Sequence, residues 1–481
     1  MYVSQTVNMK KISCRSQVLY IVAVFIISRI IALLAGLHLN GWALAAYWQY
    51  LDLETLENNL LAGVWYDHAQ PPAFNLLLGA VLKTGGRHST LLFEMIFKGI
   101  SLCNALLLFS IVKKLVVVDF LPLLVTLAYI LSPATLIFEC ELFYTTTGSL
   151  LLLVSVYYLI RLTASGNRWN ALGFILPLVL LCLTHSVYHI FWYFGVTVMI
   201  IFYFRNKRFM NYLIMASGAG ILLVGSWYVK NKILFGRFTV STWIGMNMAR
   251  NMFHDHEVKD SSRIEAYEPF SKISVYRKFL DSRFEDPYKG LNDRDLLQEF
   301  KNDSFINETE VSYIPVSDLY LKAGLDYIRT HPGDYAKNVL QSSILYFAPA
   351  NVYSLAAEQA ARIKTYDAIY SFNLTHFAKG KQQRRVLLAL SAIPKFLIYF
   401  FVFLILIRYC IQSRSVTPWN LFIMVTMVYV FGTSSFIEHY ENMRFRFETE
   451  PLFLILAAQV FSRLFSRFQI RRRAPVAELI A

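Results

Sequence analysis

The sequence predicts an α-helical polytopic membrane protein with about ten transmembrane helices, outer-face juxtamembrane helices and a small mixed extramembrane domain. Of its 481 residues, 56% are hydrophobic, and the mean hydropathy is +0.44. Apolar runs of about 20 residues recur, which is the length that crosses a bilayer core about 30 Å thick. Lys and Arg cluster between these runs, as they do in cytoplasmic loops. Such loops account for the net charge of +14, so nucleic acid is not an expected partner.

The N-terminal module, residues 1–229, is expected to hold the first spans and a first outer loop at 38–88. Its first span, roughly 17–37, contains Arg29 and lacks a small-residue cleavage site, so we interpret it as a retained span. Further spans are expected at 89–112, 142–160, 169–184 and 187–204. Basic clusters flank them: Lys10, Lys11, Arg15; Lys113, Lys114; Arg161, Arg168; Arg205, Lys207, Arg208. Placing every cluster in the cytoplasm puts both termini inside.

The segment 230–384 is the largest polar block and is expected to form a periplasmic domain, because it is too long for a simple connection. Turn pairs such as Asp286-Pro287 and Asn292-Asp293 punctuate it. Residues 254–334 hold 17 of the 32 Asp and Glu residues, which suggests that polar work is done on the outer face. Residues 71–84 and 336–353 are apolar but short, so we expect juxtamembrane or re-entrant helices there.

The C-terminal module, residues 385–481, is expected to hold the last spans and a basic cytoplasmic tail. Spans near 386–407 and 416–434 are separated by Arg408 and Arg414. The last span, near 450–467, precedes Arg471, Arg472 and Arg473. This arrangement keeps the alternation of basic clusters consistent along the whole chain.

The first outer loop carries the most unusual polar pattern in the chain. Asp52 and Glu54 precede the stretch Tyr66-Asp67-His68-Ala69-Gln70-Pro71-Pro72, at the edge of an apolar segment. Charged groups next to hydrocarbon cost free energy, so their placement indicates a site more than a linker.

Other motifs follow in order along the chain. Trp227-Tyr228-Val229-Lys230-Asn231 precedes Phe235-Gly236, then come Pro332-Gly333-Asp334-Tyr335 and Arg444-Phe445-Arg446, before Pro451 and the last span. Together with His68-x-x-Pro71-Pro72, this ordered set resembles the glycosyltransferase C superfamily, in particular protein O-mannosyltransferases and bacterial aminoarabinose transferases. The resemblance implies inverting transfer of a monosaccharide from a polyprenyl-phosphate carrier to a lipid, glycan or protein acceptor. It also implies a bacterial inner membrane and an active site that faces the periplasm.

The candidate catalytic acid does not stand at the spacing that the resemblance implies. The segment Asn59-Leu60-Leu61-Ala62-Gly63 is present, but strict spacing puts Gln49 where the family has an acid, with Asp52 three residues later. We assign Asp52 as the base that deprotonates the acceptor, with Glu54 as the reserve. The carrier phosphate is a good leaving group, so the reaction needs a proton acceptor and fixed cations but no general acid. Alternatively, Asp52 and Glu54 are acids on a solvated loop face or at the start of a helix, without a catalytic role.

The remaining candidates are substrate-binding residues, each with a structural alternative. Arg444, Arg446 and Lys230 are expected to bind the phosphate, since guanidinium donors suit its oxygens; interface anchoring is the alternative. His68 and Gln70 are expected to contact substrate, although His68 could instead bond to backbone beside the prolines. Glu139 is expected to bind sugar or acceptor. Arg29 and Lys98 either pair with nearby acids or face the phosphate.

No metal site is predicted, because Lys and Arg can neutralise the phosphate, and a divalent cation stays open as a cofactor. Two rival functions also stay open. A transporter or lipid flippase would be expected to show paired halves, and no such symmetry is visible. A polysaccharide polymerase or ligase would use similar outer-face Arg and His residues.

Overall fold

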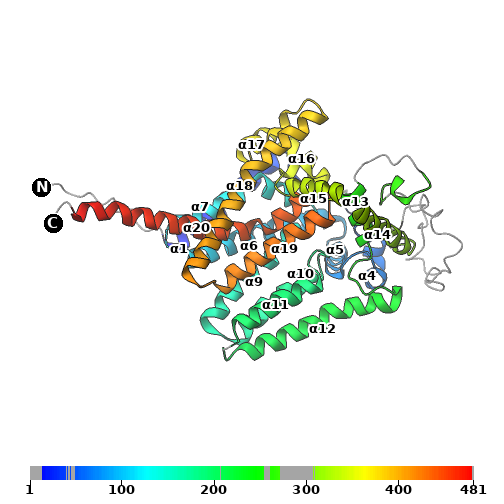
Figure 1. The fold of residues 1–481 in the computed structure, drawn as a ribbon, viewed down its shortest axis with the longest axis horizontal. Coiled ribbons are helices and arrows are strands. Elements are labelled where there is room, and N and C mark those ends of the chain that lie inside the picture. Colours follow the sequence, from blue (N-terminus) through cyan, green and yellow to red (C-terminus); the bar gives the residue numbers. More distant parts are fainter. Residues whose placement is uncertain are drawn as a thin grey trace.

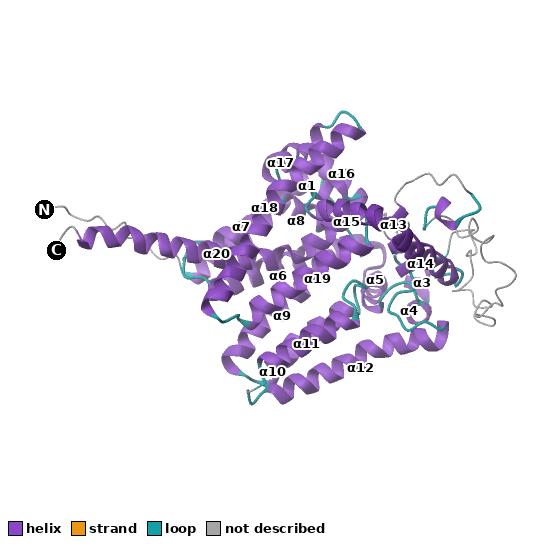
Figure 2. Cartoon of the chain, viewed as in Figure 1, coloured by secondary structure: helices purple, strands orange, loops and turns teal. Residues whose placement is uncertain are grey.

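The computed structural model describes residues 13–39, 41, 44, 49–205, 207–253, 261–270, 307 and 309–478, the side chains of 354 and 467–478 excepted. Within these ranges the chain is built from helices and contains no strand (Figures 1 and 2). The predicted α-helical class is therefore confirmed for the described residues. The turn pairs at 286–293 and the basic residues Lys10 and Lys11 lie outside them.

Six stretches are long and apolar enough to cross a membrane. They are α1 (Cys14–Leu34), α5 with α6 (Pro72–Gly85 and Ser89–Leu115), α9 (Thr145–Ser165), α12 (Met210–Phe235), α18 (Lys381–Ser413) and α19 (Pro418–Ile437). Three shorter apolar helices accompany them: α7 (Leu121–Leu131), α10 (Arg168–Cys182) and α11 (Ile190–Tyr203). The chain is thus a multi-pass helical protein, but the predicted number of about ten spans is not confirmed.

The connections that carry the predicted basic clusters meet at one end of the molecule. After α6, the Val117 N–H donates to the Ser462 hydroxyl at 3.2 Å, and Tyr409 near the end of α18 lines the same small cavity. The α9–α10 turn, at Gly166, packs against Phe209 in the α11–α12 connection. Helix α20 also ends on this side (Figure 1). These connections lie at one end of the molecule, as the distribution of the basic clusters predicted. That this end faces the cytoplasm stays a prediction.

Figure 1 shows α4, α5, α13 and α14 at the opposite end, while α16 and α17 lie at the upper edge near α18. The bounds of these and the other short helices are α3 (Leu53–Asn58), α4 (Leu60–Tyr66), α8 (Pro133–Phe138), α13 (Ile244–Phe253), α14 (Tyr313–Thr330), α15 (Pro332–Tyr346), α16 (Ala357–Arg362) and α17 (Lys364–Tyr370). The described part of 230–384 is helical, so the mixed content expected there is not seen in it. Helix α5 covers the predicted segment 71–84, and α15 covers 336–346 of the predicted segment 336–353, while the juxtamembrane or re-entrant placement of both stays a prediction.

Proline and glycine set several of these boundaries. Proline stands in the first turn of α5, α7, α8, α15 and α19, where the absent N–H costs nothing and the fixed φ suits a helix. Gly236 ends α12 with a φ of 71°, in the left-handed region that glycine enters without strain.

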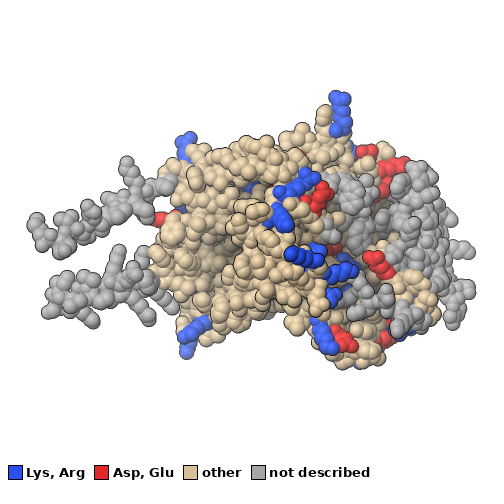
Figure 3. Space-filling model, turned by 90° about the horizontal axis from the view of Figure 1, so that it is seen from above, with Lys and Arg blue, Asp and Glu red and all other residues tan. Residues whose placement is uncertain are grey.

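The last helix, α20 (Asn442–Glu478), runs through the centre of the bundle and packs against α6, α9, α18 and α19 (Figure 1). Gly148 permits the close approach of α9, since a Cβ there would lie 1.6 Å from an Oε atom of Glu448. On the face drawn in Figure 3, Lys, Arg, Asp and Glu gather mostly toward the end opposite the end of α20, and much of the remaining surface is free of charge. That distribution suits a protein whose middle faces hydrocarbon.

Candidate functional site

Asp67 organises the turn of the first outer loop. One carboxylate oxygen accepts the N–H groups of Ala69 and Gln70 at 2.8 and 3.1 Å, and the other accepts the Asn75 amide at 3.0 Å. Lys230, at the end of α12, donates to the Asp67 carbonyl oxygen at 2.7 Å. Burial raises the pKa of Asp67 to about 6, and the Lys230 charge opposes this shift. Lys230, a predicted phosphate-binding residue, therefore joins the first loop to α12.

His68 is fully buried and bonded at both ring nitrogens. Its Nδ1 lies 2.7 Å from the Thr242 hydroxyl, and its Nε2 lies 3.1 Å from the Thr309 carbonyl oxygen. Burial, followed by the nearby Lys230, lowers the pKa of His68 to about 4. A neutral imidazole with both nitrogens occupied fixes the loop, but its partners are distant residues and not the backbone beside the prolines. Gln70 beside it is buried and contributes its N–H to the Asp67 turn.

The two predicted catalytic acids lie at the start of α3. The Asp52 carboxylate accepts the Thr55 N–H at 3.0 Å and so caps the helix, while Glu54 is exposed in the first turn. An aspartate in this position stabilises a helix start by about 1 kcal/mol. The helix-start alternative thus describes the observed contact of Asp52, and its role in catalysis stays a prediction.

Gln49 connects the first loop to the Arg-x-Arg motif. The Tyr144 hydroxyl donates to the Gln49 side-chain oxygen at 3.2 Å. The guanidinium carbon of Arg444 lies 5.3 Å from the centre of the Tyr144 ring and 4.2 Å from that of Phe143. Residues 49, 144 and 444, far apart in the chain, therefore meet in one cluster.

Arg444 belongs to a buried charge network between α13 and the α19–α20 loop. It donates to Glu441 at 2.6 Å, and the other Glu441 oxygen lies 3.4 Å from Arg250. Arg250 also pairs with Glu438 at 2.9 Å. Burial raises the pKa of Glu438 to about 7 against the pull of Arg250. This network holds the α19–α20 loop in place.

Arg446 does not share the Arg444 cluster. It pairs with Glu450 on its own helix and lies 3.5 Å from the Tyr399 hydroxyl of α18. Two residues on an α-helix are about 200° apart around its axis, so the alternate spacing directs the side chains to opposite faces. The two guanidiniums are therefore held by different acids, and a shared role of Arg444 and Arg446 in binding phosphate stays a prediction.

Three further candidates are paired internally. Arg29 binds both oxygens of Glu139, at 2.8 and 2.7 Å, and also the Ile130 carbonyl oxygen at 2.6 Å. Lys98 pairs with Glu94 one turn earlier on α6, at 2.5 Å. Arg29 and Lys98 are therefore both paired with acids, as one of the two alternatives for them predicted. The partner of Arg29 is Glu139.

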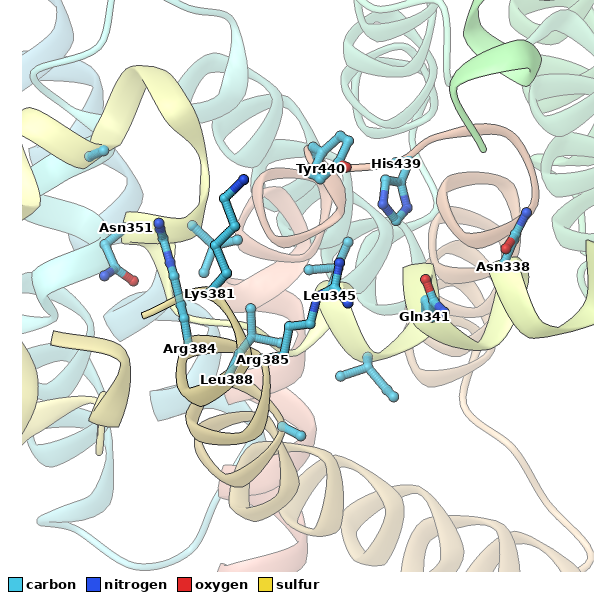
Figure 4. A pocket seen from close by; sticks show the side chains of 14 residues that line it. Asn338, Gln341, Leu345, Asn351, Lys381, Arg384, Arg385, Leu388, His439 and Tyr440 are labelled. Carbon is cyan, nitrogen blue, oxygen red and sulfur yellow. The ribbon is translucent and has the colours of Figure 1, made fainter. Parts of the chain in front are cut away.

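A large cavity opens beside the α19–α20 loop, with a volume of about 910 Å³. Its charged walls come from α18, whose Lys381, Arg384 and Arg385 face His439 and Tyr440 of the loop (Figure 4). The other lining residues are Asn338, Gln341, Ile344 and Leu345 of α15, Asn351, Val352 and Ala357, and Leu388 and Ala389 of α18. The lining contains no Asp or Glu, and its three cations form no ion pair with a described residue. The cavity is therefore suited to an anion with an apolar part.

The sequence explains why these cations share one wall. Lys381, Arg384 and Arg385 stand at i, i+3 and i+4, which is one face of a helix, and they occupy the first turns of α18, where the helix dipole adds positive potential. The exposed side chains of Val386 and Leu390 follow, so the cavity lies where the apolar span begins.

The loop opposite this wall is fixed tightly. His439 is buried and lies 2.9 Å from the Ser342 hydroxyl of α15 through its Nδ1. Tyr440 has a φ of 75°, a backbone conformation that is strained for a residue with a side chain. Such strain, roughly 1–3 kcal/mol, is concentrated at functional sites.

Sequence reasoning missed this basic wall. The signal was nevertheless available: Lys381, Arg384 and Arg385 precede a span at the end assigned to the outer face, against the usual preference of Lys and Arg for the cytoplasm. For a metal, no group of three His, Cys, Asp or Glu side chains comes together in the part of the chain that the structure describes.

No protein-family model matches the chain, and no curated protein matches it. The likeness to the glycosyltransferase C superfamily therefore stands on the order and spacing of the motifs, and on nothing beyond them.

Proposed function

We propose that this protein is a membrane glycosyltransferase that uses a polyprenyl-phosphate sugar as donor. In this proposal it transfers a monosaccharide, with inversion, to a lipid, glycan or protein acceptor at the periplasmic face of a bacterial inner membrane. The observation that carries the proposal is the cavity at the head of α18, whose charged lining is entirely cationic. A polyprenyl-phosphate sugar combines an anionic phosphate with an apolar tail, and the lining offers both cations and apolar side chains.

The cavity accounts for both parts of such a donor. Lys381, Arg384 and Arg385 supply donors to the phosphate oxygens, and the exposed apolar surface of α18 continues from the cavity along the span. The volume of about 910 Å³ falls within the range of small-molecule sites. The phosphate is thus assigned to α18 in place of Arg444 and Arg446, which are bound to Glu441 and Glu450.

The three cations would act mainly on the departing phosphate. As the bond between the sugar C1 and the phosphate oxygen breaks, negative charge grows on the phosphate, and preorganised cations stabilise that charge. Arg444 acts through Glu441, by holding the α19–α20 loop that presents His439 to the cavity. The acceptor still requires a carboxylate to take its proton.

The test is a transfer assay with purified protein in nanodiscs. Undecaprenyl phosphate bearing one radiolabelled hexose or pentose serves as donor, and envelope lipids, glycans and proteins serve as acceptors. Label should move into an acceptor fraction with the wild type, and transfer should fall at least tenfold in the Arg384→Gln/Arg385→Gln variant. Arg408→Gln, at the other end of α18, is the matched control.

Two results would overturn the proposal. One is the absence of transfer for every donor and acceptor in the panel with folded protein. The other is movement of intact labelled lipid between the leaflets of a liposome without any glycan product, which would identify a flippase.

A further inference from the structure

The loop between α8 and α9, residues 139–144, is fixed on both sides of Glu141. Glu139 is bound by Arg29, as described above. The Tyr50 hydroxyl donates to the Leu142 carbonyl oxygen, and the Tyr144 hydroxyl donates to Gln49. Glu141 is therefore held at a fixed place next to the first outer loop and the Arg444 cluster.

The Glu141 carboxylate itself is uncommitted. The residue is only 8% exposed, yet its carboxylate forms no hydrogen bond or ion pair with any residue that the structure describes. The Glu141 carboxylate oxygens are not fully enclosed by protein atoms, so they border accessible space. Among the acids around this loop, Glu139 and Glu94 are instead bound to Arg29 and Lys98. A nearly buried acid left without a partner is costly for stability, and such a cost is typical of functional groups.

One short segment links Glu141 to the cavity. Val352 and Ala357 line the cavity. Of their chain neighbours, Tyr353 packs its ring on Phe138 with the ring centres 6.4 Å apart, and Glu358 acts on Glu141 through its charge. The Tyr353 ring centre is 5.8 Å from the Arg444 guanidinium, which also covers Phe143 and Tyr144. The segment that lines the cavity therefore also contacts the surroundings of Glu141.

The surroundings adjust Glu141 for proton transfer near neutral pH. Burial, and then the negative charge of Glu358 on α16, raise the pKa of Glu141 to about 8. General bases work best when their pKa lies near the operating pH. The titratable and charged groups around the loop are Tyr50, Cys140, Arg29 with Glu139, Lys98 with Glu94, and Glu358 with Arg362.

We propose that Glu141, rather than Asp52, accepts the proton of the attacking acceptor group in the transfer reaction. The acceptor O–H or N–H proton passes to a Glu141 oxygen while the acceptor atom forms its bond to the sugar C1. The bond from C1 to the phosphate oxygen breaks, and its electron pair leaves with the polyprenyl phosphate. Asp52 keeps its observed role as the cap of α3. This inference rests on the proposed function.

The experiment compares pH–rate profiles of variants in the transfer assay. Glu141→Gln should lower kcat at least a hundredfold with KM changed less than about threefold, the size expected for loss of a general base. Wild-type kcat should rise with pH through a midpoint near 8. Glu358→Gln should keep the maximal rate and move that midpoint to lower pH, because it removes a charge that raises the Glu141 pKa.

Further variants make the result decisive. Glu57→Gln, an exposed acid on α3, is the control for a change in net charge. Glu141→Asp should recover part of the rate and keep the rise with pH. Size-exclusion elution of each variant reports folding. Asn is as good a helix cap as Asp, so Asp52→Asn removes the charge and keeps the cap of α3.

The proposal is overturned if Glu141→Gln keeps wild-type kcat and its pH dependence, or if Asp52→Asn abolishes transfer while Glu141→Gln does not. Absence of transfer by the wild type refutes the proposed function itself, which separates the two failures.

Discussion

Arg29 and Glu139, 110 positions apart in the sequence, form a buried ion pair with two hydrogen bonds, at 2.8 and 2.7 Å. Arg29 lies in α1 and Glu139 in the loop after α8, so the pair ties the first span to the loop that carries Glu141. A bidentate guanidinium–carboxylate contact is strongly directional. The pair therefore sets the position of this loop as well as neutralising two buried charges.

Removing one partner of this pair should destabilise the protein strongly. Arg29→Met leaves Glu139 buried without its cation, for which we expect a loss of about 3–5 kcal/mol in the free energy of unfolding. The double variant Arg29→Met/Glu139→Met should recover most of that loss, since no orphaned charge is left. Denaturant unfolding in detergent micelles would measure both, and equal loss in the single and double variants would contradict this account.

The local parts of the fold could be predicted from the sequence. The expected spans 169–184 and 187–204 correspond to α10 (Arg168–Cys182) and α11 (Ile190–Tyr203) within a few residues, because an apolar run and its flanking polar residues are adjacent in the chain. The number of spans was harder to predict, because α10 and α11 are shorter than a helix that crosses a whole membrane.

The candidate site could be predicted only in part, because its contacts depend on distant partners. Nothing local indicates that Arg29 would bind Glu139 and leave Glu141 uncommitted. The spacing of Arg444 and Arg446 suggested a shared ligand, and only the helical conformation of α20 separates them. Lys381, Arg384 and Arg385 of α18 line a cavity only because the fold places His439 and Tyr440 opposite them.

Gly148 should not tolerate a side chain. A Cβ at this position would lie 1.6 Å from Glu448, whose other carboxylate oxygen is 3.2 Å from His185. Gly148→Ala must therefore push α9 away from α20, and overpacking of this kind costs about 1–3 kcal/mol. Thermal unfolding should show the loss, with Gly99→Ala as control because open space surrounds that position. Equal effects of the two substitutions would contradict the predicted close contact.

His68 should make the protein sensitive to acid. Its pKa is about 4 in the folded protein and 6.5 without burial, so the folded state binds the proton less readily than the unfolded state. The associated stability is complete above pH 6.5 and is lost as the pH falls to 4, by roughly 3 kcal/mol at most.

A His68→Gln variant tests this acid sensitivity. It should unfold more easily at pH 7, because the contacts to Thr242 and Thr309 are altered, but its stability should change less between pH 6.5 and 4. His331→Gln, an exposed histidine, should keep the wild-type slope. An unchanged slope in His68→Gln would exclude His68 as the source.

The cations of α18 should bind phosphate through charge. Undecaprenyl phosphate without a sugar, in nanodiscs of zwitterionic lipid, should bind the wild type at least tenfold more tightly than Arg384→Gln/Arg385→Gln, since each hydrogen bond to a charged group contributes about 1.5–3 kcal/mol. Higher salt should weaken wild-type binding and reduce this difference. Neutral polyprenol is the control ligand, and it should distinguish the two proteins poorly. Equal binding of phosphate and alcohol would contradict a phosphate site.

Glu141 should lower stability at alkaline pH, whatever reaction the protein performs. Its pKa rises from 4.5 to about 8 on folding, so the folded state holds the proton more tightly than the unfolded state. Stability is therefore highest below pH 4.5 and falls as the pH rises, until the loss is complete above pH 8. The shift corresponds to about 5 kcal/mol as an upper limit. Melting temperatures between pH 5 and 9 would measure it.

The variant Glu141→Gln should flatten this pH dependence and melt higher than the wild type at pH 9, while losing transfer activity. Such a gain in stability with a loss of function is the pattern expected when a strained or unpaired group is kept for catalysis. Glu358→Gln should also raise the melting temperature at pH 9, by a smaller amount, because it removes only the charge that opposes ionisation of Glu141. If Glu141→Gln melts lower than the wild type at pH 9, Glu141 has a stabilising partner when ionised and is not held as a free base.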